Sequence, residues 1–288
     1  MTHRLARRDR IAQMDPETEY SAIVQIMLDY DFSWDLYRAL ELAMMRTFAV
    51  PSIGRLLHRT GEFRALPQKR YDDSVLLIFA MLYHGSHQPE GRGAASRVNH
   101  IHGHYRISNE DFLYTLSTFV VVPVRWLQDF GWRNLHPHEV RALTLAVIDM
   151  GRSMGIERIP STYEEFERLF DAYERAKFAY APENEAVARS MLALAQSWVP
   201  RGLRRLALVL VLAFLDRPMR DALGLSHPPR VLTSIVRGAV RLRGQLVRFM
   251  PARREERPFV LTTRTYPNGH RLDELGPHRI LERLHEVA

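Results

Sequence analysis

Apolar residues recur at intervals of three and four along almost every segment of this chain, and strand-like alternation is scarce. The segment 34–48 is an example, because four of its apolar residues fall on one helical face: Leu36, Leu40, Ala43 and Met44. This spacing matches the 3.6-residue period of an α-helix and not the two-residue period of a strand. The pattern therefore predicts an all-α fold.

Several helix ends carry their own signals. Ser108 precedes an apolar run and is followed three residues later by Asp111, a spacing typical of a capped helix start. Ser161 and Glu164 repeat that spacing, which predicts a helix over 161–180. Pro123 lies inside the helix expected after Ser108, and we expect it to kink or break that helix because proline lacks the backbone N–H.

The longest apolar run is LALVLVLAFL at 206–215. Its ten residues are too few to cross a bilayer core, which needs about 20. The run predicts a buried helix, with an element on a membrane surface as the alternative. The N-terminal residues begin basic but contain no apolar stretch of the kind that a secretory signal needs. We therefore predict neither a signal peptide nor a transmembrane helix, and a cytoplasmic protein with membrane-surface contact as a further expectation.

Composition indicates an ordinary globular protein. Of the 288 residues, 46% are hydrophobic and 25% are charged, which suits one sizeable core. We expect an N-terminal extension at 1–29, a helical domain at 30–250, and a Pro/Arg-rich tail at 251–288 that either is loosely ordered or wraps the domain. The chain has no cysteine, which excludes disulfides, thiolate metal sites and iron–sulfur clusters.

The net charge of +7 is compatible with three kinds of partner: nucleic acid, an anionic membrane surface or an anionic cofactor. Its arginines are spread along the chain, and no zinc-finger spacing or glycine-rich phosphate loop accompanies them. We therefore expect no nucleic-acid partner.

The segment VNHIHGHY at 98–105 holds three histidines in five positions. His102 shares a helical stripe with Ala95, Val98 and Tyr105, whereas His100 and His104 lie to either side of that stripe. A histidine on an apolar stripe is either a satisfied core residue, which periodicity alone favours, or a metal ligand. A zinc site at His100 and His104 would resemble H-E-x-x-H, but the glutamate and a third ligand are missing.

A second candidate segment, 44–73, is dense in cations. Within it, Arg55 and Arg59 share one face of a short helix expected to end at Gly61, and Thr60 lies on the adjoining face. The segment is equally compatible with a solvated basic helix and with donors that face an anion or a bound oxygen.

Four stretches of the chain resemble the MpaB-type oxygenases, and the similarity as a whole runs from about residue 30 to about 277. They are RTFAVPSIGRLLHRTGEF, PQKRYDDSVLL, VNHIHGHYRISNEDFLYTLSTF and RTYPNGHRLDELGP. That family shares its catalytic domain with the latex-clearing rubber oxygenases. The resemblance implies a single globin-like, multi-helix domain that encloses a haem b pocket.

The resemblance also implies roles for particular residues. His102 occupies the position of the proximal iron ligand, and the pair Arg59-Thr60 matches a basic residue and threonine on the distal side of the haem. The rubber oxygenases have lysine at that basic position, so Arg59 is a departure: a guanidinium donates hydrogen bonds but hardly ligates iron. Glu41 lies near the place of the family's proposed base. Four further residues are candidates for contact with the haem: Arg55, Arg97, Tyr105 and Arg106.

The activity implied by the resemblance is oxidative cleavage of a carbon–carbon double bond by dioxygen. The substrate would be apolar, for example a prenyl chain, and such substrates dissolve in membranes. The chain also has an amphipathic segment at 231–250 that would suit contact with a membrane surface. The alternative function is a non-catalytic helical protein that binds haem or lipid.

Overall fold

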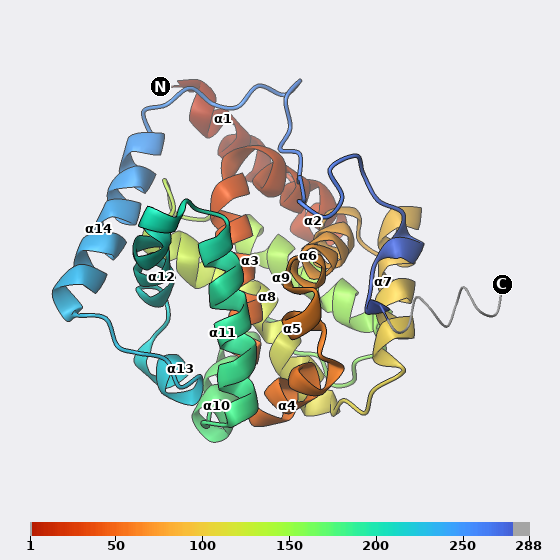
Figure 1. The fold of residues 1–288 in the computed structure, drawn as a ribbon. Coiled ribbons are helices and arrows are strands. Elements are labelled where there is room, and N and C mark those ends of the chain that lie inside the picture. Colours follow the sequence, from red (N-terminus) through yellow and green to blue (C-terminus); the bar gives the residue numbers. More distant parts are fainter. Residues whose placement is uncertain (1, 279–288) are drawn as a thin grey trace.

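Helix α8 (Asn109–Phe130) runs through the centre of the molecule in the computed structural model, which describes residues 2–278 (Figure 1). Every residue from Leu116 to Val124 is buried. Helices α3 (Ser33–Thr47), α9 (Pro137–Ser153) and α10 (Tyr163–Lys177) pack against α8. A helix that is apolar all round is stable only when other elements enclose it, so α8 forms the core of the domain.

The described residues 2–278 form helices and connecting turns without a β-strand, which confirms the all-α prediction. The other elements are α1 (Thr2–Ile11), α2 (Pro16–Ile26), the π-helix η1 (Met27–Asp31), α4 (Pro51–Thr60), α5 (Glu62–Ala65), α6 (Pro67–His84), α7 (Pro89–His102), α11 (Pro182–Ser197), the 3-10 helix η2 (Arg201–Leu203), α12 (Arg204–Leu212), α13 (Arg217–Ala222), α14 (Arg230–Val247) and the 3-10 helix η3 (Leu272–Glu274).

The start of α8 is capped as the sequence predicts, but the helix continues through Pro123 without the predicted break. The backbone N–H of Asp111 donates to Ser108 Oγ at 3.0 Å, so Ser108 caps the helix as predicted. Pro123 lies within a helix that continues to Phe130. Proline removes one backbone hydrogen bond, but the apolar residues on both sides of Pro123 are buried. Burial of that length of helix outweighs the lost bond.

Two other sequence predictions are wrong in detail. Helix α10 is capped by Thr162, which accepts from the Glu165 N–H, while Ser161 donates to the Glu165 carboxylate; the cap is therefore one residue later than predicted. The apolar run at 206–215 is not a buried helix, because Leu206 and Leu210 of α12 are 51% and 41% exposed. Helix α12 lies between α11 and α14 and packs against both (Figure 1).

Both ends of the described chain pack on the helical body. Within the segment 1–29, Ile11, Ile23 and Val24 are fully buried, and α2 packs against α9. The segment after α14 wraps the domain and passes over α6 and α7 (Figure 1). There Thr265 Oγ1 donates to Asp72 at 2.6 Å. Both ends of the described chain therefore pack on the same body as the central helices.

Candidate functional site

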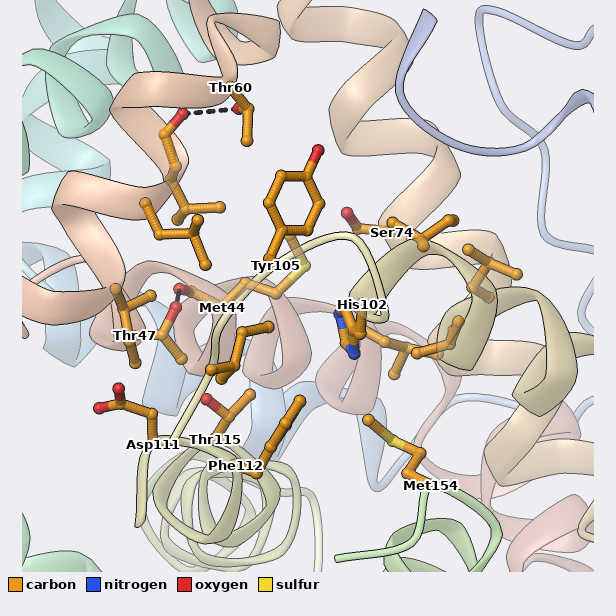
Figure 2. A pocket seen from close by; sticks show the side chains of 18 of the residues that line it. Met44, Thr47, Thr60, Ser74, His102, Tyr105, Asp111, Phe112, Thr115 and Met154 are labelled. Atoms are coloured by element: carbon orange, nitrogen blue, oxygen red, sulfur yellow. Dashed lines mark hydrogen bonds between the residues drawn. The ribbon is translucent and has the colours of Figure 1, made fainter. Parts of the chain in front are cut away.

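An apolar cavity of about 260 Å³ lies among helices α3, α4, α6, α7 and α8 (Figure 2). Each of these helices contributes the side chains of one face, which is why residues far apart in sequence meet there. Most of the wall is aliphatic or aromatic, as in Met44, Phe48, Leu56, Leu77, Phe112 and Phe119. A concave apolar wall with a few polar groups is the usual form of a small-molecule site.

His102 is the last residue of α7 and lines this cavity. Its ring lies 5.3 Å from the Phe112 ring, centroid to centroid, and Figure 2 shows it projecting from the end of α7 into the cavity. Its Nδ1 is buried without a hydrogen-bond partner in the described residues 2–278. Burial, reinforced by the nearby charge of Arg70, lowers the His102 pKa to about 4. The imidazole is therefore neutral at pH 7.

The two neighbouring histidines point elsewhere. His100 and His104 are exposed and lie outside the cavity lining. His104 Nδ1 lies 2.8 Å from the His100 carbonyl oxygen, and the two rings meet edge to face. Residues 2–278 contain no group of three or more His, Asp or Glu side chains arranged to hold a metal ion. Of the three histidines, His102 alone lines the cavity.

Arg70 of α6 also lines the cavity, and the sequence analysis did not single it out from the other cations. Its guanidinium donates to Ser74 Oγ and, among residues 2–278, forms no ion pair within 4.0 Å. Burial lowers the pKa of Arg70. The signal that could have found it is the stripe Arg70, Ser74, Leu77, Met81, since those positions share one helical face with the cavity.

Asp111 brings a polar group to the cavity wall at the first turn of α8. Its Oδ1 accepts hydrogen bonds from Ser52 Oγ at 2.9 Å and from the Tyr173 hydroxyl at 2.5 Å. The helix dipole also favours a negative charge at this end of α8. Asp111 therefore links α4, α8 and α10 at the edge of the cavity.

Four of the sequence-predicted site residues line the cavity beside His102: Arg59, Thr60, Tyr105 and Arg106. Arg59 and Arg106 are exposed, so they stand where the cavity meets solvent. The Thr60 hydroxyl donates to the Leu57 carbonyl at 2.7 Å (Figure 2). That bond uses the proton that Thr60 would otherwise offer to a ligand.

Glu41 and Arg55 are not among the residues that line the cavity. Glu41 of α3 accepts a hydrogen bond from the Tyr71 hydroxyl and pairs with Arg38 at 2.9 Å, and burial raises its pKa. Arg55 is exposed on α4. Spacing in the sequence could not show that the faces of α3 and α4 that carry these two residues turn away from the cavity.

Arg97 is also outside the lining and instead holds the C-terminal segment. It donates to the Leu275 carbonyl at 2.7 Å, which commits the guanidinium to backbone oxygens. Lys69 holds the same segment through the Gly276 carbonyl at 3.0 Å, and Asp73 accepts from the Gly276 N–H at 3.1 Å. Because Gly276 itself lines the cavity, this segment closes one part of its wall.

ER-bound oxygenase mpaB' of Penicillium brevicompactum is 26% identical over 262 residues, which cover 84% of this chain and 62% of the relative. ER-bound oxygenase mpaB of the same organism is 31% identical over 163 residues, 54% of this chain and 41% of the relative. The chain thus spans less than two thirds of the length of these relatives. Within residues 2–278, no helix is long and apolar enough to cross a membrane.

Among solved structures, the latex clearing protein LCP in its closed state superposes with a TM-score of 0.53 at 16% identity. The match covers 87% of this chain and 69% of the LCP chain, and at that identity it is a likeness of fold alone. The family described as "ER-bound oxygenase mpaB/B'/Rubber oxygenase, catalytic domain" matches residues 35–248. That match confirms the resemblance noted from the sequence, and this chain belongs to the MpaB/rubber oxygenase catalytic-domain family.

Proposed function

We propose that this protein is a haem b-dependent oxygenase that binds an apolar substrate and cleaves a carbon–carbon double bond with dioxygen. The observation that carries the proposal is His102, a neutral imidazole on the wall of an apolar cavity whose Nδ1 has no partner in residues 2–278. Neutral imidazole is the form that ligates a metal. Membership of an oxygenase family supports the same chemistry.

The residues of the cavity fit the proposed cofactor. His102 would hold the haem iron through a ring nitrogen, and Phe112 lies against its ring. Arg70, a cation at the wall without an ion pair in the described chain, would hold a propionate. Arg59 and Arg106 are further candidates, whereas Arg97 is committed to the C-terminal segment.

The bound haem would supply the activation of dioxygen. The chain's own residues would bind the substrate and exclude water, since the wall is built mostly from apolar side chains. The guanidinium of Arg59 carries N–H donors and no acceptor, so it would act as a hydrogen-bond donor and not as a base. We assign no step to Glu41, because it lies outside the cavity lining.

An absorption spectrum tests the haem proposal. Protein purified with haem should show a Soret band, and His102→Ala should lose it or shift it strongly. His104→Ala is the matched control, because His104 stands two residues away and is exposed outside the cavity. Circular dichroism of each variant verifies that the fold is intact. An unchanged spectrum in His102→Ala would contradict the ligand assignment.

The alternative is a helical protein that binds haem or lipid without catalysis. The Thr60 hydroxyl donates to its own helix and Glu41 lies outside the lining, so two of the three predicted catalytic groups donate no proton into the cavity. Oxygen consumption with alkenes of prenyl type distinguishes the two functions. Carbonyl products and oxygen uptake support the oxygenase, and haem binding without either supports the carrier.

A further inference from the structure

Helix α14 presents two opposite apolar faces. Val236 and Gly244 are buried against the body of the protein. On the opposite side, the α14 row comprises Val231, Ile235, Leu242, Leu246 and Phe249, which are 57–72% exposed. Steps of four, seven, four and three residues place this row on a single stripe along the helix and its end. Large apolar side chains gathered in this way on a surface mark a contact site.

The neighbouring helix extends the exposed apolar surface. Helix α12 contacts α14, and the two lie together at one side of the molecule (Figure 1). Leu203, Leu206 and Leu210 are 41–51% exposed and follow helical spacing. Leu206 and Leu210 belong to the run at 206–215 that the sequence alone predicted to be buried. The end of that run, at 212–215, packs into the core, whereas these two leucines stay exposed.

The charged side chains of α12 and α14 themselves are all arginines. Neither 186–215 nor 222–254 contains an aspartate or glutamate. Three arginines of α14 pair with carboxylates of the body, Arg237 and Arg241 with Asp129 and Arg243 with Asp35. Five others are exposed and belong to no ion pair among residues 2–278: Arg201, Arg204, Arg205, Arg230 and Arg248.

We infer that α14, with α12 beside it, docks on the surface of an anionic lipid bilayer. An amphipathic helix that combines exposed large apolar residues with flanking arginines lies in the plane of such a surface, with its apolar row among the acyl chains. The unpaired arginines would meet lipid phosphates and carboxylates, each strengthening attachment. No residue of α12 or α14 lines the cavity, so docking would leave the site around His102 intact.

Charge argues against a second copy of the chain as the occupant. A two-fold dimer interface brings a surface against itself. Here it would set the unpaired arginines of one copy against those of the other, with no carboxylate in either helix to separate them. An anionic bilayer supplies both the apolar layer and the negative charge.

Vesicle flotation of the full chain tests the inference. The protein should float with vesicles of phosphatidylcholine and phosphatidylserine, float less with phosphatidylcholine alone, and detach as salt is raised. The double variant Ile235→Gln/Leu242→Gln and the double variant Arg230→Glu/Arg248→Glu should each weaken binding about tenfold or more. Val260→Gln is the matched control, since Val260 is 70% exposed outside both helices.

Light scattering and the absorption spectrum complete the experiment. The docking variants should keep the circular dichroism, the haem spectrum and the oligomeric state of the parent, so failure of docking and failure of the haem proposal are separable. The inference is overturned if the parent protein does not float with the anionic vesicles. It is equally overturned if the docking variants float as well as the parent does. It is also overturned if those variants instead convert a dimer to a monomer.

Discussion

Arg133, in the connection between α8 and α9, is enclosed by two carboxylates. Its guanidinium lies 2.6 Å from Asp31 and 2.7 Å from Glu139, and the three side chains are 8%, 2% and 0% exposed. Replacing Arg133 by Met keeps much of the volume but leaves Glu139 buried without an ion pair in the described chain. Asp31 keeps only the more distant Arg7, whose guanidinium lies 3.8 Å away. Breaking a buried ion pair from one side costs about 3–5 kcal/mol. That is a large part of the roughly 5–15 kcal/mol that stabilises a folded protein.

The cost of Arg133→Met should depend on pH. Burial raises the pKa of Asp31, and Arg133 opposes that effect, so its removal raises the pKa further. Between the unfolded pKa, about 3.9, and the higher folded value, the native state holds more protons than the unfolded state. Stability therefore falls as pH rises through that window. The free energy lost by the variant should be smaller at low pH than at pH 8.

Urea unfolding followed by circular dichroism measures both effects. The matched control is Arg141→Met, because Arg141 pairs with Glu17 at the surface, where the side chains are 34% and 56% exposed. Exposed pairs contribute about 0–1 kcal/mol, so the control should remain close to the parent. The reasoning is refuted if Arg133→Met is no less stable than the Arg141→Met control. It is also refuted if the free energy of unfolding that Arg133→Met loses grows as the pH is lowered.

Two further predictions follow from close packing and from the cavity histidine. Gly91→Ala should destabilise the protein by at least about 1–3 kcal/mol, because a Cβ there would lie 1.9 Å from the Gly85 carbonyl oxygen; Gly93→Ala, which meets only the tip of Leu272, should be nearly neutral in the same urea assay. Without haem, the free energy of unfolding should fall more between pH 7 and pH 4 in the parent protein than in the His102→Ala variant. The His102 pKa of about 4 lies below its ordinary value of 6.5, so in that interval the unfolded state binds the proton that the native state refuses; equal losses in both proteins would contradict the burial of His102.

The helices were largely predictable because their signals are local. The Ser108 cap and the apolar faces of α3 and α6 depend on residues three or four positions apart, and the structure has them as expected. Pro123 does not end α8, because burial of the apolar residues on both sides of it outweighs the one lost hydrogen bond. The run at 206–215 misled because apolar composition indicates burial only when a neighbouring element is there to cover it.

In the candidate site, too, the features that depend on local spacing were predictable and those that depend on packing between helices were not. The helical stripe that holds His102 could be read from periodicity, and the resemblance to oxygenases agreed with it. The sequence alone does not distinguish Arg55, Arg97 and Arg106 as partners of the cofactor, because spacing does not show what each guanidinium contacts. The structure places Arg106 at the cavity, Arg55 in solvent and Arg97 on the C-terminal carbonyl oxygens. It adds Arg70, whose position depends on how α6 turns toward α7 and α8.

The amino-acid sequence by itself determined the all-α class, the main helix starts and the histidine that faces inward. Each of these follows from side chains within one or two helical turns of one another. Tertiary structure decided which arginines reach the cavity, that the C-terminal segment closes part of its wall through Gly276, and that α12 and α14 keep apolar rows exposed. These features join residues up to 207 positions apart, as Lys69 and Gly276 are. Contacts of that separation are set by how whole helices pack, and no local pattern encodes them.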